Sequence, residues 1–127
     1  MAEQFPQEAL TRQIIGACIE VHKHLGAGLL ESAYERCLIH ELSLRNIPAL
    51  RQVTLPLKYK GVDIDASFAM DVLVNDEVVL ELKSIEKVLP IHRAQILTYL
   101  RLSGKKVGLL VNFNVPLLKD GIDRFIN

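Results

Sequence analysis

Two carboxylates and a lysine near the middle of the chain have the residue types and spacing to hold a divalent cation. Asp71 lies in one short apolar segment, and Glu81 and Lys83 lie in the next, after a polar break at residues 75–77. Both segments have the composition of strands, so the sequence predicts a β-hairpin. Because side chains alternate along a strand, the three charged groups would converge on one face. Facing carboxylates repel each other and are costly to bury, and a hard cation with oxygen ligands would relieve both costs.

This chemistry depends on the register of the hairpin. A three-residue loop pairs Val74 with Val78 and sets the Asp71 side chain opposite Glu81. A two-residue loop would send the two carboxylates to opposite faces of the sheet. In a further alternative, Glu81 and Lys83 are solvated residues on an amphipathic edge strand. The spacing predicts the three-residue loop and leaves the solvated alternative open.

A third carboxylate lies at the start of a predicted helix over residues 30–45. Glu31 and Tyr34 are one turn apart and therefore share a face of that helix. An acid in the first turn also complements the positive end of the helix dipole. Local sequence favours this structural role of Glu31 as strongly as a role at the hairpin.

A polar stripe on another predicted helix, residues 91–103, follows directly after the strand of Glu81 and Lys83. His92, Gln95 and Tyr99 recur at steps of three and four residues beside an apolar face. A polar stripe ordinarily faces water, but Gln and Tyr are less typical of an exposed face than Lys and Glu. We therefore predict that this stripe lies over the carboxylates.

The remaining elements complete an α/β pattern. The sequence predicts another helix over 7–25, strands over 50–58, 62–65 and 107–113, and a short final helix within 117–127. The segment 107–113 is almost wholly apolar, which is typical of a strand buried on both faces. His22 continues the apolar face of the first helix, so we expect the backbone to satisfy its ring. No cysteine–histidine spacing is typical of zinc, and we expect Cys18 and Cys37 to be reduced and packed.

Length and composition limit the class of protein. With 127 residues, half of them hydrophobic, the chain is expected to form one domain over residues 1–127. No apolar run is long enough to span a membrane, and the first six residues lack the features of a secretory signal, so we expect a cytoplasmic protein.

The charge balance argues against a non-specific grip on long duplex DNA. Fifteen basic residues balance fifteen acidic ones, for a net charge of zero. The distribution is uneven, because from Lys83 to Lys106 six basic residues stand against the single acid Glu86. That third of the chain could face a phosphate backbone, or it could be a solvated helix surface.

The segment Gly28-Leu29-Leu30-Glu31-Ser32-Ala33-Tyr34 matches the signature of the GxxExxY proteins. These resemble small bacterial and archaeal members of the PD-(D/E)xK nuclease-like superfamily. The resemblance runs from about Ile14 to Phe125 and includes the segments 21–22, 25–28, 79–83, 94–100 and 111–114. It implies a restriction-endonuclease-like α/β core, with N-terminal helices, a mixed sheet with a central β-hairpin, a crossover helix and a buried strand.

The resemblance also implies a metal site for Mg²⁺ or Mn²⁺. By it, Asp71 is an acidic metal ligand, and Glu81 and Lys83 form the (D/E)xK pair. The backbone carbonyl of Leu82 would add a ligand. Glu31 would complete the metal shell directly or through water.

The implied activity is metal-dependent hydrolysis of phosphodiester bonds in nucleic acid. Lys83 would position the attacking water or neutralise charge on the phosphate, and Gln95 would orient the lysine or the nucleophile. Tyr99 would buttress Glu31 or stack near the substrate. One departure is Ala69, where relatives often carry an arginine.

A non-catalytic module is the alternative to an enzyme. The same scaffold could bind nucleic acid, a nucleotide or a protein without cleavage. A homodimer or an accessory partner would enlarge the limited surface that one small domain offers to a duplex.

Overall fold

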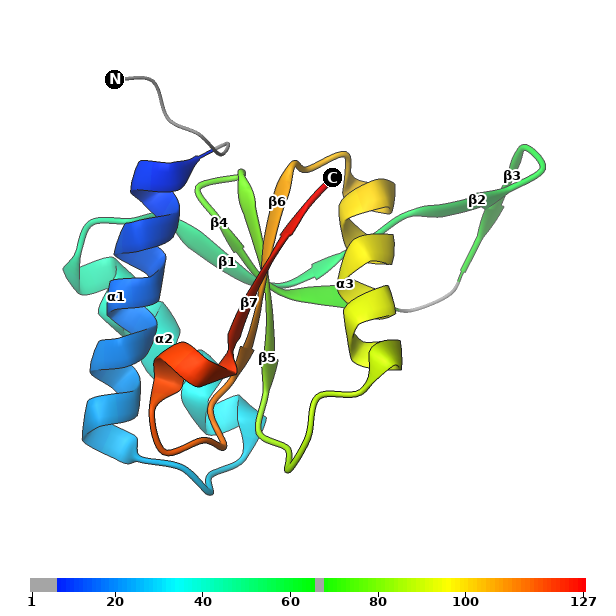
Figure 1. Cartoon of the computed structure of the whole chain (residues 1–127). Coiled ribbons are helices and arrows are strands. Elements are labelled where there is room, and N and C mark those ends of the chain that lie inside the picture. The colour runs from blue at the N-terminus through cyan, green and yellow to red at the C-terminus, as the bar shows by residue number, and fades with distance from the viewer. Residues whose placement is uncertain (1–6, 66–67) are drawn as a thin grey trace.

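A five-stranded mixed sheet forms the centre of the molecule, in the order β1-β4-β5-β6-β7. The computed structural model describes residues 7–65 and 68–127, so the prediction about a secretory signal in the first six residues lies outside the described residues. The strands of this sheet are β1 (Ala49–Thr54), β4 (Ala69–Val74), β5 (Val78–Lys83), β6 (Val107–Asn112) and β7 (Ile122–Ile126). Helices α1 (Glu8–Leu25) and α2 (Glu31–Leu44) cover one face, and α3 (Pro90–Ser103) covers the other (Figure 1).

Alternation along β4 and β5 divides the core into two layers. Val72 and Leu80 pack in the cluster beneath α1 and α2, whereas Leu73 and Val79 pack with Leu100 of α3. Each face of the hairpin therefore meets a different helical layer, which explains why its apolar run is almost continuous.

The hairpin register agrees with the three-residue loop. Val74 pairs with Val78, and Glu77 N–H donates to Val74 O at 2.9 Å. Asn75 and Asp76 both adopt positive φ, at 52° and 55°, a conformation that these two residue types tolerate better than most. The predicted register is confirmed, and it places the carboxylate-bearing positions of β4 and β5 side by side.

Helix α3 connects the parallel strands β5 and β6 and ends where the sequence predicts. Gly104 caps it in the left-handed conformation, with φ 73°, and its N–H donates to Leu100 O at 2.9 Å. Every residue of β6 is buried, as predicted. At Gly108 the helix approaches so closely that an added Cβ would lie 2.9 Å from Ile96 Cδ1. Because Gly108 has no side chain, α3 can pack close to the sheet at this point.

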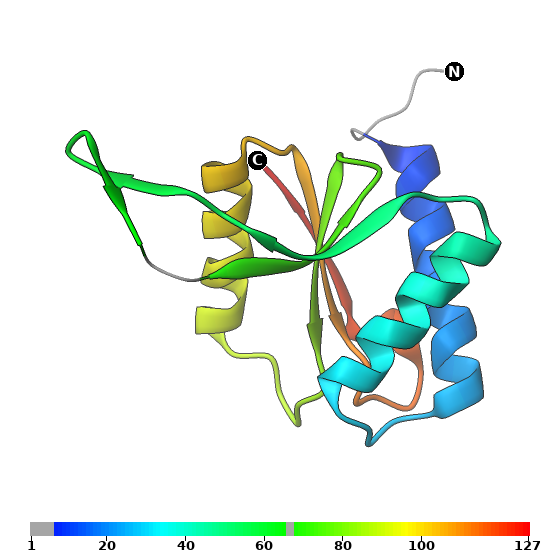
Figure 2. The same ribbon diagram turned by 180° about the vertical axis from the view of Figure 1, so that it is seen from behind.

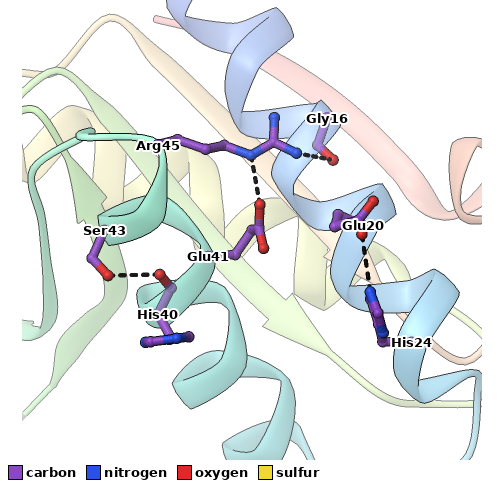
Figure 3. Close-up of polar contacts among 7 residues, drawn as sticks. All are labelled: Gly16, Glu20, His24, His40, Glu41, Ser43 and Arg45. Atoms are coloured by element: carbon purple, nitrogen blue, oxygen red, sulfur yellow. Dashed lines mark hydrogen bonds and ion pairs between the residues drawn. The ribbon is translucent and has the colours of Figure 1, made fainter.

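Polar contacts tie α2 to α1 on the opposite face of the sheet (Figure 3). Arg45 Nε donates to Glu41 Oε2 at 2.8 Å, and Arg45 Nη2 donates to Gly16 O at 3.4 Å. Near the start of α2, the ring of Tyr34 stacks on Phe113, with centroids 4.3 Å apart. The two helices thus form one layer joined to β6.

The predicted final helix is wrong. A short 3-10 turn, η1 (Leu118–Gly121), leads into β7, which pairs antiparallel with β6. The free edge of β6 supplies backbone partners that an isolated terminal helix would lack, and these decide the outcome. The predicted strand over 50–58 is also divided, because Leu55 and Pro56 separate β1 from β2 and proline has no N–H for the ladder.

The strands β2 (Leu57–Tyr59) and β3 (Val62–Ile64) form an arm that projects away from the body, beyond α3 (Figures 1 and 2). Lys60 and Gly61 make its turn, with φ of 50° and 83°. Leu57 pairs with Ile64 and Tyr59 with Val62, so these four residues share one apolar face. Much of that face is exposed, because the arm belongs to a separate two-stranded sheet.

The surroundings of His22 and of the two cysteines test three further predictions. His22 Nε2 lies 2.9 Å from Val115 O, which confirms the backbone partner of its ring. Both cysteines are unbridged, as expected; Cys18 is buried, but Cys37 is exposed and not packed, since it lies on the outer side of α2. None of the helices in the described ranges combines the length and apolarity that crossing a bilayer demands.

Candidate active site

Asp71 and Glu81 meet across the central hairpin. The Asp71 backbone N–H donates to Glu81 Oε1 at 3.2 Å, and the Leu82 backbone N–H donates to Asp71 Oδ2 at 2.8 Å. Only 3% of Glu81 is exposed. Each carboxylate is thus held by the backbone of the opposite strand, which only the three-residue loop allows.

Burial and mutual repulsion disfavour two negative charges at this point. Burial first, and then the charge of Asp71, raise the pKa of Glu81 to about 8. Burial also raises the pKa of Asp71, against the hydrogen bond from Leu82 N–H. Without a cation, this raised pKa favours the protonated form of Glu81.

Lys83 lies on the same face of β5 as Glu81, two residues beyond it, but does not neutralise the carboxylate pair by direct contact. Within the described chain no salt bridge joins its ammonium to either carboxylate, although its charge lowers the pKa of both. Its side chain lines a cavity of about 500 Å³ beside α3. The ammonium is thus available to a group that enters from solvent.

Helix α3 brings two of its three predicted polar residues to the site. Gln95 Nε2 donates to Tyr99 Oη at 3.0 Å, and Tyr99 is buried. Burial, and next the charge of Glu81, raise the pKa of Tyr99, which places this phenol within electrostatic reach of the acidic pair. His92 acts differently, because its Nδ1 accepts the Leu89 N–H at 2.9 Å and so caps the start of α3, although the ring also borders the cavity.

Glu31 lies at the end of β5, beside the pair but not within it. Its Oε2 accepts the Ser84 N–H at 3.3 Å, and Ser84 Oγ donates to Leu29 O at 2.5 Å. Over the described residues, no group of three or more His, Cys, Asp and Glu side chains is placed to hold a metal ion. Tyr34 has a structural role, because its hydroxyl donates to Gly26 O at 2.5 Å and accepts Leu29 N–H at 3.2 Å.

Comparison with known families accounts for this arrangement. A sequence profile described as the PD-(D/E)XK nuclease superfamily matches residues 8–125. The chain belongs to the PD-(D/E)XK nuclease superfamily. Neither the curated proteins nor the solved structures give a significant match. The restriction-endonuclease-like α/β fold is confirmed, and membership of the GxxExxY proteins stays a prediction.

The donor set of this candidate site suits a hard divalent cation. Asp71 and Glu81 supply carboxylate oxygens, which Mg²⁺ and Mn²⁺ prefer. A bound cation would offset the repulsion that raises the Glu81 pKa. Two side-chain ligands leave further positions to a backbone carbonyl, to water or to a substrate oxygen.

Glu35 of α2 is a buried acid close enough to influence Asp71 that sequence reasoning missed. Its carboxylate accepts Arg51 Nε at 2.6 Å and Gln52 Nε2 at 2.9 Å, and its charge contributes to the raised pKa of Asp71. The available signal was its position four residues after Glu31, on the same helical face. Its partners lie on β1, more than a dozen residues away in sequence.

Asn112 was also missed, and it fixes the segment that follows Lys83. Its Oδ1 accepts Ile85 N–H at 3.1 Å, and its Nδ2 donates to Ile85 O at 3.0 Å. Asn112 is buried at the end of β6 and pairs with Lys83 in the parallel ladder. This two-way bond anchors the chain as it leaves β5, so the direction of the Lys83 backbone is set by β6.

Proposed function

We propose that this protein is a nuclease that hydrolyses phosphodiester bonds of nucleic acid with Mg²⁺ or Mn²⁺. The observation that carries the proposal is the contact of Asp71 with the buried Glu81, with Lys83 on the same face of β5 as Glu81, in a PD-(D/E)XK scaffold. A buried, repelling carboxylate pair lowers stability unless it serves a ligand.

Asp71, Glu81 and the backbone carbonyl of Leu82 would hold the metal ion, with Glu31 taking part directly or through water. A divalent ion in such a site polarises the scissile phosphate and lowers the pKa of a bound water. The N–H groups of Asp71 and Leu82 keep the two carboxylates facing each other before substrate arrives. Because the ligands are already in place, little free energy is needed to rearrange the site when metal and substrate bind.

Lys83 would stabilise the negative charge that develops on the phosphoryl oxygens. Its ammonium is free of salt bridges within the described residues, so it can bind the phosphate without breaking an existing pair. Gln95 would orient the lysine or the attacking water, and its bond to Tyr99 holds the amide in place. Tyr99 would support the carboxylates from the α3 side.

A second candidate is a module that binds nucleic acid, a nucleotide or a protein without cleaving it. Three observations favour it: the net charge of zero, Ala69 in place of a frequent arginine, and the lack of a three-carboxylate cluster in the described chain. These lower the expected affinity for phosphates and metal.

The test compares the wild type with Asp71→Asn and Glu81→Gln on single-stranded, duplex and branched DNA and RNA. We expect cleavage in Mn²⁺ or Mg²⁺ that both substitutions abolish, and calorimetric metal binding that both weaken. Glu77→Gln, in the hairpin loop and away from the carboxylate pair, is the matched control and should behave as wild type. Wild-type activity in a purified Glu81→Gln variant would exclude this site. Nucleic-acid binding without any cleavage would support the second candidate.

A further inference from the structure

The cavity beside α3 has walls that suit a flat, apolar group. It measures about 500 Å³, within the range of about 300–1,000 Å³ for small-ligand sites. The rings of Phe68 and Tyr99 form one wall, with centroids 6.0 Å apart and planes 1° apart. Ile91, 68% exposed, and the small Ala94 border the opening from α3. An exposed isoleucine next to parallel rings offers surface on which a planar ring can stack.

Polar groups at two positions in this cavity would fix the orientation of a bound ligand. Gln95 uses one amide N–H on Tyr99 Oη, and within the described residues its carbonyl oxygen has no partner. An amide that offers both an acceptor and a second N–H matches the mixed donor and acceptor edge of a nucleobase. At the other end, Lys83 joins the cavity to the acidic pair. A base among the apolar walls would therefore leave its phosphate close to the ammonium.

We infer that this cavity binds an unpaired nucleobase beside the scissile phosphate, so that the protein selects single-stranded or branched nucleic acid over continuous duplex. The inference rests on the proposed function and specifies its substrate. In a duplex both faces of each base are stacked and its edge is paired, so no base can enter without being extruded. A base that is already unpaired needs no extrusion, and it gains stacking on the apolar walls.

Binding in EDTA tests the inference without cleavage. The probe is a short oligonucleotide with a single 2-aminopurine, measured by anisotropy and by base fluorescence, as single strand and as duplex. We expect the wild type to bind the single strand more tightly and to change the emission of the probe base. Ala94→Leu fills the cavity and should weaken single-strand binding about tenfold or more, because one stacked base contributes roughly that factor. Ile91→Ser should act in the same direction.

The control is Leu97→Phe, which adds bulk to α3 at a position 42% exposed and outside the cavity lining. It should bind as wild type, and all variants should keep the wild-type unfolding midpoint, since each site is on the surface. Equal binding of single strand and duplex, or an unaffected Ala94→Leu, would overturn the base site. Base-site binding without cleavage in metal would instead refute the nuclease and leave the base site standing. Equal cleavage of single strand and duplex that Ala94→Leu leaves unchanged would instead refute the base site and leave the nuclease standing.

Discussion

At the scale of single residues, Glu81 combines deep burial with a neighbouring carboxylate. Its ordinary pKa is 4.5, and in the folded chain the value rises to about 8. The folded protein therefore binds one proton more than the unfolded chain between these two values. A proton-linked contribution of this sign is full at low pH and is lost as pH rises through the folded-state pKa.

We expect the metal-free protein to lose stability as pH rises from about 5 to about 8. Glu81→Gln, which keeps the shape without the charge, should flatten this dependence. Thermal unfolding in EDTA across this range measures both, with Glu77→Gln as control, which should keep the wild-type slope. An unchanged slope in Glu81→Gln would mean that another group is responsible.

Glu35 provides a second prediction, because its carboxylate receives two hydrogen bonds from β1. Glu35→Gln removes a buried charge bound to Arg51 and should cost about 1.5–3 kcal/mol of unfolding free energy, as expected for charge-assisted bonds. Glu41→Gln breaks the Glu41–Arg45 pair of Figure 3, a helical i,i+4 pair whose carboxylate is 20% exposed against 9% for Glu35, and should cost only about 0.3–0.5 kcal/mol. Urea denaturation of the two variants measures the two losses of unfolding free energy. Equal losses would show that the Glu35 hydrogen bonds stabilise the fold no more than the Glu41–Arg45 pair does.

At the scale of elements, the site depends on how closely α3 packs against β6. Gly108 permits this approach, since a Cβ there would lie 2.9 Å from Ile96 Cδ1 and 3.3 Å from Leu100 Cδ1. Gln95 and Tyr99 lie on the same helix, so a displaced α3 would carry them away from Asp71 and Glu81. Packing distance and site geometry are therefore coupled.

We expect Gly108→Ala to cost about 1–3 kcal/mol through overpacking. Ile96→Val removes the methyl group nearest to the new Cβ, so the double variant should lose less than the sum of the two single costs. A double-mutant cycle in denaturant measures this coupling. Strict additivity would mean that the helix, and not the Ile96 side chain, yields to the added methyl group.

At the scale of the whole molecule, stability is concentrated in the sheet between the two helical layers. Strands β5 and β6 are buried along nearly their full length, while the β2–β3 arm stands apart with an exposed apolar face. The Lys58–Asp63 ion pair on the arm is 3.7 Å long and exposed, so it contributes little. Two strands without a third or a helix are only marginally stable in water.

Hydrogen exchange should therefore be fastest in the arm and slowest in β5 and β6. Mass spectrometry of the isolated protein resolves the two regions, and α1, with its buried face, serves as an intermediate reference. Protection in the arm comparable to that in β5 would contradict its independence and show that its apolar face is covered in solution.

The features that the sequence determined by itself are local ones. Asn75 and Asp76 tolerate positive φ, so the three-residue loop and the register of Asp71 against Glu81 follow from neighbouring residues. The cap at Gly104 and the burial of β6 follow from residue type and hydrophobic pattern in the same way. The loop and the cap depend on contacts within one turn, and the unbroken apolar run of β6 is itself a local pattern.

Only the tertiary structure decided what depends on partners distant in the chain. Glu35 is held in place because β1 brings Arg51 and Gln52 to it, and Asn112 matters because Ile85 reaches it from the end of β5. The last segment is a strand because β6 offers it a free edge. Local propensity cannot specify these outcomes, because the hydrogen bonds that stabilise them form only after the chain has folded.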